Sequence, residues 1–195
     1  MSMFTVIPED TFNALQLDAG VLLKTFDPAH PAKPADSDII CATTGGINAS
    51  CVAEYSDLGE DVDNCPNNMM ELKHLDSWAC TLGFTSLHMS PEMIKRSLGA
   101  ADIDAKTGAI TPRRNVALTD FEDIWWVGDK ADGGMAAIKL HHALSTGGFS
   151  LQTTKAGKGQ LTCELTGHVS IEDQDTMPMT FYSTSASTEG GNEGA

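Results

Sequence analysis

The sequence has few basic residues for its size. Its 195 residues include 12 Lys and Arg against 27 Asp and Glu, which gives a formal net charge of −15. A surface that binds nucleic acid gains affinity by placing Lys and Arg against phosphates, and anionic membranes attract the same side chains. The composition therefore disfavours an extended DNA- or RNA-binding surface and attachment to an anionic membrane.

Long apolar runs and closely spaced cysteines are also missing. No apolar run approaches the roughly 20 residues that cross a bilayer, and the N-terminus lacks the basic start and apolar stretch of a signal peptide. The five cysteines include no CxxC pair, which supports neither a zinc knuckle nor a thioredoxin-type site. We therefore expect free thiols in a protein made in a reducing cytosol.

Sequence signatures of catalysis are absent as well. The chain contains no G-x-S-x-G elbow, P-loop, H-E-x-x-H or G-x-G-x-x-G motif. The adjacent His141 and His142 lie in a predicted strand, where neighbouring side chains point to opposite faces and cannot grip one ion. We predict no enzymatic activity, no catalytic residue, no metal and no cofactor.

What the sequence does have is alternation of apolar and polar residues. Between Gln160 and Ile171, Leu161, Cys163, Leu165, Val169 and Ile171 share one face, as in a strand with one solvated side. Similar runs occupy residues 15–23, 47–55, 78–84 and 135–143, and glycine pairs separate several of them. Within the last of these runs, the pattern places Ala136, Ile138 and Leu140 inward. Several such strands with glycine turns predict a mostly β protein, an antiparallel sandwich or barrel.

One segment has the signals of a short helix instead. Ser90 is a favourable N-cap, Pro91 suits the first turn and Gly99 can close the helix in the left-handed conformation. Ile94 and Leu98, four residues apart, are expected on its packed face. We predict a two-turn helix flanking the sheet.

The remaining segments read as connections within a single domain at residues 1–182, a size typical of one domain. Residues 27–38 contain three prolines and predict an extended connector, and residues 183–195 are rich in Ser, Gly and Thr and predict a flexible tail. Residues 56–70 predict an acidic loop with Asp57, Glu60, Asp61 and Asp63. Its spacing does not match an EF-hand, so we expect a solvated or partner-facing loop rather than a calcium site.

The run from Ile124 to Val127 is apolar on both faces. Either this strand is buried inside the sandwich, or one of its faces is covered by another subunit. Tryptophan is enriched where interfaces bury large surfaces. Trp125 and Trp126 are therefore candidate subunit-interface residues, and both alternatives stay open.

Several blocks of the sequence, taken in order, resemble one protein family. They lie within residues 13–182, at 38–51 (DIICATTGGINASC), 56–68, 71–78 (ELKHLDSW), 120–129 (DFEDIWWVGD), 141–154 and 157–168 (GKGQLTCELTGH). Together they are similar to the major tail tube proteins of long-tailed, non-contractile bacteriophages that infect Gram-positive bacteria. None of the blocks is a chemical signature by itself, so the resemblance depends on their number and order.

This resemblance implies a β-sandwich with a flanking helix that assembles into hexameric rings with a continuous inner β-barrel. The rings stack into a tube that carries DNA into the host without binding it specifically. It also implies a structural virion protein in the phage tail, synthesised in the bacterial cytoplasm. Its partners would be further copies of itself, a tape measure protein, a tail terminator, and baseplate or distal tail proteins.

By the same analogy, the acidic loop at residues 56–70 would stack one ring on the next. Arg113 and Arg114 of the neighbouring ring are candidate partners for its carboxylates. A ring of six chains would carry six times the charge of −15, and a lumen lined by part of that charge would repel DNA so that it slides. Two alternatives remain: a β-sandwich module that binds a ligand through its loops, and the tube protein of a contractile tail or tailocin.

Overall fold

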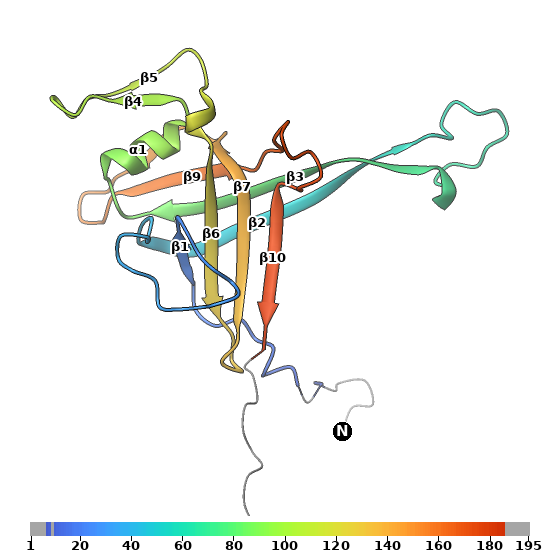
Figure 1. The fold of residues 1–195 in the computed structure, drawn as a ribbon, viewed down its shortest axis with the longest axis horizontal. Helices are drawn as coiled ribbons and strands as arrows, with labels where there is room; N and C mark the ends of the chain where they lie inside the picture. Colours follow the sequence, from blue (N-terminus) through green and yellow to red (C-terminus); the bar gives the residue numbers. More distant parts are fainter. Residues whose placement is uncertain (1–6, 9, 186–195) are drawn as a thin grey trace, which may run out of the picture.

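Antiparallel strands are the main regular structure in the described part of the chain, which comprises residues 7, 8 and 10–185 of the computed structural model (Figure 1). The strands are β1 (Val21–Leu23), β2 (Thr43–Asp57), β3 (Lys73–Ser86), β4 (Ala101–Ile103), β5 (Ile110–Pro112), β6 (Glu122–Asp129), β7 (Met135–Ser145), β8 (Ser150–Gln152), β9 (Gln160–Thr166) and β10 (Met179–Thr184). The other elements are the helix α1 (Pro91–Leu98) and the 3-10 turns η1 (Met70–Leu72) and η2 (Leu118–Asp120). The predicted mostly β, antiparallel class with one short helix is confirmed.

Strand β7 belongs to both halves of a sandwich. Its first part pairs with β6 and β10, whereas Leu144 and Ser145 pair with β9. The strand bends between these parts at His142, whose φ of 46° is left-handed and whose N–H donates to the Asp123 carboxylate at 3.1 Å. One half is therefore β1–β6–β7–β10, and the other contains β8, β9, β3 and β2. The strands of the two halves cross in Figure 1, as expected when a bent strand passes from one sheet to the other.

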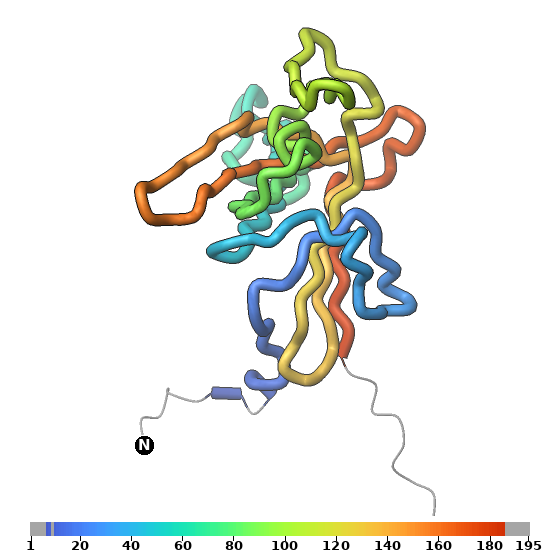
Figure 2. Tube along the Cα trace, turned by 90° about the vertical axis from the view of Figure 1, so that its left-hand side faces the viewer, coloured from blue at the N-terminus to red at the C-terminus, as the bar shows by residue number. Residues whose placement is uncertain are grey.

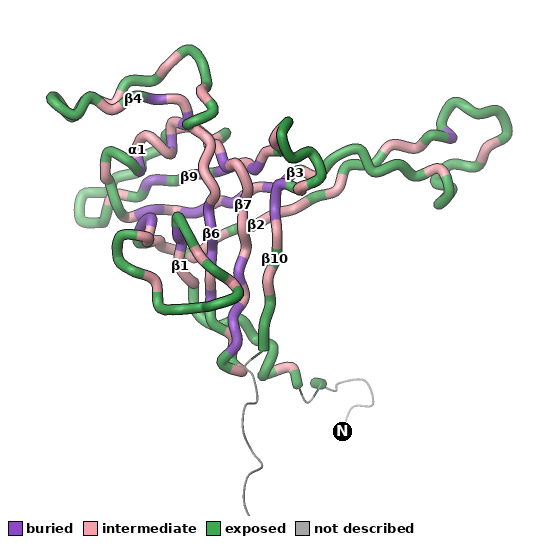
Figure 3. The backbone as a smooth tube through the Cα atoms, viewed as in Figure 1, coloured by how far each residue is buried: buried purple, intermediate pink, exposed green. Residues whose placement is uncertain are grey.

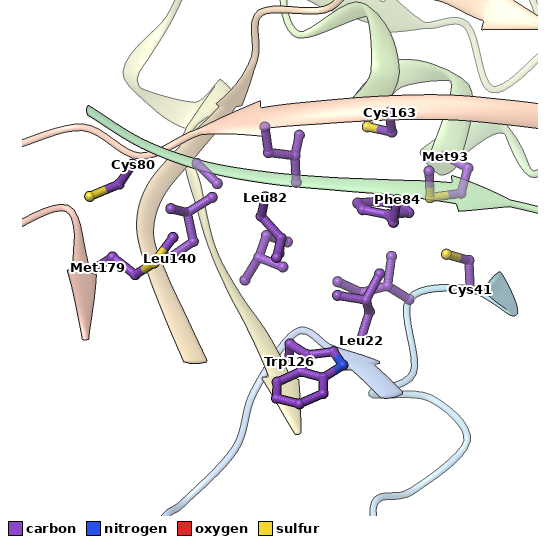
Figure 4. Close-up of a cluster of buried hydrophobic side chains, with 14 of the residues drawn as sticks. Leu22, Cys41, Cys80, Leu82, Phe84, Met93, Trp126, Leu140, Cys163 and Met179 are labelled. Carbon is purple, nitrogen blue, oxygen red and sulfur yellow. The ribbon is translucent and has the colours of Figure 1, made fainter. Parts of the chain in front are cut away.

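The hydrophobic core lies between these halves (Figure 4). Leu82 of β3, Leu140 of β7 and Leu161 of β9 are completely buried there. Removing one such side chain from water is worth roughly 1.5–3 kcal/mol, so rows of them hold the two sheets together. Alternation predicts that Trp78, Cys80, Leu82 and Phe84 share one face of β3; the last three are buried, and Trp78 is half-buried against the core. The predicted inward positions in the first part of β9 are also buried.

The alternating segment that begins at Gln160 forms a shorter strand than predicted. β9 ends at Thr166 because Gly167 N–H donates to the Cys80 carbonyl while His168 N–H donates to the His141 carbonyl, so the chain leaves the ladder. Val169 is 46 % exposed and Ile171 86 % exposed. The prediction that these two residues continue the inward face is wrong.

The alternating segment at residues 15–23 also forms less strand than predicted. Only β1 is regular, because Asp18 and Gly20 have φ values of 56° and 68° and interrupt the extended backbone. Leu15 and Leu17 are accordingly exposed. Left-handed residues occur in strands mainly at breaks, and nothing in the apolar alternation reveals them.

The predicted inward row of β7 is confirmed. Leu140 is completely buried in the core, and Ala136 and Ile138 are half-buried side chains that pack against it. Met135 and Ala137, which alternate with this row, are also buried, although they do not belong to the core cluster. Alternation therefore identifies the core-facing row of β7 but does not reveal that side chains on its other face are buried as well.

The helix begins and ends as predicted. The Ser90 hydroxyl accepts from Met93 N–H at 3.1 Å, and Gly99 has a φ of 76°. The buried face differs from the prediction, because Met93 and Ser97 face the sandwich whereas Ile94 and Leu98 are half-buried. The Ser145 hydroxyl of β7 donates to the Ser97 carbonyl at 2.7 Å, which fixes this rotation of the helix.

The prediction for the connector agrees with the structure, whereas the predicted start of the tail does not. Residues 27–38 contain neither helix nor strand, as predicted for the connector. Ser183 and Thr184, predicted to begin the tail, belong to β10 instead, and residues 186–195 lie outside the described residues. Within the described residues, no helix is long and apolar enough to cross a membrane.

The most unusual feature is a β-hairpin that extends well beyond the sandwich (Figures 1 and 3). It is formed by the second half of β2 and the first half of β3, and we call residues 52–79 the arm. Register runs without interruption from Cys51–Cys80 to Glu54–Ser77, shifts by one residue, and continues to Asp57–Lys73. Most of the arm is exposed, so its strands are held by pairing rather than by a core.

Candidate functional site

The outward face of the β2–β3–β9 sheet is a flat surface of small polar residues. It is opposite the core, and facing residues from the three strands form rows across it. Its members are Thr44, Asn48, Ser50, Thr81, Gly83, Thr85, Thr162, Glu164 and Thr166, which we call the polar face. All of them are partly or fully exposed.

The polar face contains one ionisable side chain, Glu164, and no Lys or Arg. The excess of acidic residues in this chain is therefore carried elsewhere, mainly on loops. At the edge of the face, the hydroxyls of Thr146 and Thr166 are hydrogen bonded at 2.7 Å. Short hydroxyl side chains give a wetted surface that offers neither a charged nor an apolar binding patch.

The acidic loop predicted at residues 56–70 forms the tip of the arm. Asp57 closes this tip, because its carboxylate accepts from Asn68 N–H at 2.9 Å and from Gly59 N–H at 3.0 Å. These two backbone bonds hold the pKa of Asp57 below its ordinary value, and Lys73 lies 3.8 Å away. Asp57 therefore has a structural role within the tip.

The other predicted acidic residues, Glu60, Asp61 and Asp63, are exposed and make no ion pair within the described residues. The structure gathers them on one projecting turn. In the described part of the chain, no group of three or more His, Cys, Asp or Glu side chains is arranged to hold a metal ion. Their location is instead suited to contact with another molecule.

Apolar side chains on the arm were missed by sequence reasoning, which considered only its charge. Leu58, Val62 and Met70 are 63 %, 55 % and 82 % exposed, and Val52, Tyr55, Met69 and Leu75 are exposed as well. Exposed apolar residues gathered on a projecting element mark interaction sites more often than scattered ones do. Their signal in the sequence is an apolar residue at every third or fourth position of an otherwise acidic segment.

The arm also leaves a long strand edge without a partner. β2 pairs only with β3 among the described strands, so the other edge of its 15 residues is free. The outer edge of β10 is likewise unpaired in the described part of the chain. Unpaired edges are templates for pairing with another chain.

The basic residues proposed to receive the arm are only partly available. Arg113 donates to the Asp120 carboxylate at 2.6 Å and lies 3.0 Å from Asp102, so its charge is used within its own chain. Arg114 is exposed. Lys155 and Lys158, in the loop between β8 and β9, are exposed and form no ion pair within the described residues. This loop lies at the opposite end of the molecule from the arm (Figures 1 and 2).

The two candidate interface tryptophans are buried within a single chain, each 7 % exposed. Trp125 contacts Phe26 edge-on at 5.6 Å and Tyr182 at 5.5 Å, measured between ring centroids. Trp126 faces the core, and its indole N–H donates to the Ala19 carbonyl at 2.9 Å. The strand is thus covered on both faces inside the subunit, and the burial of these residues requires no neighbouring subunit.

A hollow of about 980 Å³ lies between the connector on one side and β1, the end of β6 and the start of β7 on the other. Pro28, Pro31 and Pro34 line one side, and Gly128, Gly133 and other backbone positions line the opposite side. Its ionisable residues are Asp18, Lys33 and Asp129. No sequence pattern predicts this hollow, because it is formed by segments that are distant along the chain.

Comparison with known proteins adds no relative, since the sequence matches no protein-family model and no curated protein. Three features of the molecule bear on its function: the arm, the polar face and the unpaired strand edges.

Proposed function

We propose that this chain is a structural subunit of a bacteriophage tail tube, which polymerises as stacked hexameric rings around a DNA conduit. The observation that carries the proposal is the arm. An exposed hairpin with apolar and acidic side chains gains little stability in an isolated chain, whereas burial against a second copy would cover those apolar groups. The resemblance of the sequence to tail tube proteins supports the same assignment.

In this proposal the polar face lines the conduit. Its long strands have one wetted side, and their free edges allow neighbouring subunits to continue the sheet around a ring. Neutral hydroxyl groups and one carboxylate provide no cation to hold phosphates. The conduit would thus not bind DNA, because its wall has no Lys or Arg. Its wall would also carry less acidic charge than the net charge of the chain suggests.

The arm tip would contact the loop that carries Lys155 and Lys158 in an adjacent copy. Acidic and basic groups at opposite ends of one molecule form a head-to-tail contact, which repeats into rings or filaments rather than stopping at a dimer. The carboxylates Glu60, Asp61 and Asp63 face solvent in the single chain and are free to make this contact.

Electron microscopy of the purified protein by negative stain tests the proposal. We expect six-fold rings or hollow tubes, formed spontaneously or after addition of a tail initiation complex. A variant in which a two-residue turn replaces residues 58–71 should retain its circular dichroism spectrum and remain monomeric. If the intact chain stays monomeric at high concentration and under crowding, the tail tube assignment is wrong.

A charge-swap experiment tests the head-to-tail contact. Reversing Glu60, Asp61 and Asp63 to Lys should abolish polymerisation, and so should K155E/K158E. Mixing the two variants should restore alternating contacts and rescue assembly. Failure of the mixture, with both variants folded, would remove this choice of partner surface without removing the tube itself.

The hollow beside the connector favours a second candidate, a β-sandwich module that binds a small ligand. A volume of about 980 Å³ is large enough for a drug-sized molecule. Thermal-shift screening of a monomeric preparation against a metabolite library would test it. A saturable shift lost on substitution of Lys33 would favour this candidate.

A further inference from the structure

Two cysteines face each other where the arm leaves the sandwich. Cys51 of β2 is the direct cross-strand partner of Cys80 of β3, and their Sγ atoms are 3.0 Å apart. Both are free thiols; Cys80 is buried, whereas Cys51 is partly exposed. Disulfide sulfurs lie about 2.05 Å apart, so closing the bond needs a movement of about 1 Å. Rotation of the two side chains can supply it.

We propose that Cys51 and Cys80 are an oxidation site, which a small disulfide such as oxidised glutathione converts into a cross-strand disulfide. Cys51 attacks one sulfur of the oxidant, forming a mixed disulfide and releasing one glutathione. Cys80 then attacks Cys51 Sγ and releases the second glutathione. The two protein thiols are oxidised, one molecule of oxidant is reduced, and the two thiol protons leave with the two glutathione molecules.

The order of these steps follows from the surroundings of the two sulfurs. Burial and the neighbouring Cys51 raise the pKa of Cys80 to about 12, so its thiolate is scarce at neutral pH. Cys51 is also the more exposed residue of the pair, which makes it the one that a dissolved oxidant would meet first. Cys80 reacts only in the second step, when the Cys51 sulfur that it attacks already lies beside it.

The disulfide would fasten the root of the arm. Residues 52–79 would become a closed loop anchored to the core-facing side of β2 and β3, independently of whether the arm serves in a tail tube. Closing a loop of this length removes conformational freedom from the unfolded chain. The folded sandwich should therefore unfold at a higher temperature after oxidation.

The experiment incubates the full chain with oxidised glutathione, or with dithiothreitol, and quenches with a thiol-blocking reagent. We expect free thiols to fall from five to three and the melting temperature to rise by about 5 °C or more. Trypsin cuts after Lys73, between the two cysteines, so mass spectrometry should find the peptides on either side joined until reduction. Fragmentation distinguishes Cys51 from Cys41 and Cys65 in the first peptide.

Matched variants separate this site from general thiol oxidation. Cys51→Ser should abolish the joined peptides and the temperature rise, while Cys65→Ser, in the arm tip, should retain both. If Cys51→Ser fails to fold, the peptide map of the unmodified chain still shows whether Cys51 and Cys80 are joined. Five free thiols after prolonged oxidation, or a cross-link that joins Cys80 to Cys41 or Cys65, would overturn the proposal.

Discussion

Gly20 shows how one residue fixes the position of a buried tryptophan. Its φ is 68°, and a Cβ added there would lie 2.5 Å from the Trp126 indole nitrogen and 2.6 Å from the Val127 carbonyl. The adjacent Ala19 carbonyl accepts the hydrogen bond from that indole. The approach of β1 to β6 at this point therefore requires a residue without a side chain.

Substituting Gly20 with Ala should lower the free energy of unfolding by about 2–4 kcal/mol, combining backbone strain with displacement of Trp126. Gly148→Ala is the matched control, because Gly148 has a φ of 71° but nothing within 4 Å of an added Cβ. The control should lose only about 1–2 kcal/mol. Urea unfolding measures both, and equal losses would show that contact with Trp126 contributes nothing.

Asp120 links the end of η2 to Arg113. Burial disfavours its charge, but the Ala117 N–H and the Arg113 guanidinium outweigh burial and lower the pKa of Asp120 from 3.8. Because the folded pKa is below the unfolded one, the stabilisation is complete above pH 3.8 and is lost as pH falls through the folded value.

Asp120→Asn should therefore destabilise the protein by about 1–3 kcal/mol at pH 7, with the difference from the unmodified chain shrinking below pH 3.8. Denaturant unfolding across this pH range tests the expectation. Asp61→Asn, at the exposed arm tip, should leave stability within about 0.5 kcal/mol. A loss for Asp120→Asn that does not change with pH would assign its role to packing alone.

At the scale of elements, the sequence predicted what local chemistry determines. The Ser90 cap, the Gly99 termination and the inward row of β3 follow from nearest neighbours. The ends of β1 and β9 depend on positive φ angles and on carbonyls of distant strands, which alternation does not encode. The face of α1 depends on Ser97 meeting β7. The sequence predicts an acidic loop at residues 56–70, but how far the arm projects depends on the pairing between β2 and β3, which the local sequence does not reveal.

The arm and the body should respond differently to loss of an apolar side chain. Leu58→Ser and Met70→Ser, at exposed positions of the arm, should leave stability within about 0.5 kcal/mol. Leu82→Ala, in the part of β3 that crosses the sandwich and completely buried, should cost about 2–5 kcal/mol.

Polymerisation should respond in the opposite way when equal concentrations of folded protein are compared. Light scattering should report impaired polymerisation for the two arm variants, because they remove apolar contacts to a neighbouring copy. Leu82→Ala should polymerise normally once its folded fraction is taken into account. Unimpaired polymerisation of both arm variants would mean that their apolar side chains are not contact residues.

For the whole molecule, where the charges lie matters more than their sum. The net charge of −15 suggests repulsion of DNA from any surface of the protein. The polar face nevertheless has only Glu164 as an ionisable group, while the arm tip and other loops carry many acids. Exposed charges separated by more than about 8 Å are largely screened at physiological salt. DNA in a conduit would respond to the residues that line it.

Two substitutions with the same change in net charge can test this distinction. Glu164→Lys places a cation on the polar face, whereas Glu172→Lys places one on an exposed loop outside that face. In assembled tubes, Glu164→Lys should retain DNA and slow its release, with retention falling as salt rises because a Lys–phosphate contact exchanges counterions. Glu172→Lys should release DNA as the unmodified tube does. Equal behaviour of the two variants would mean that the polar face does not line the conduit.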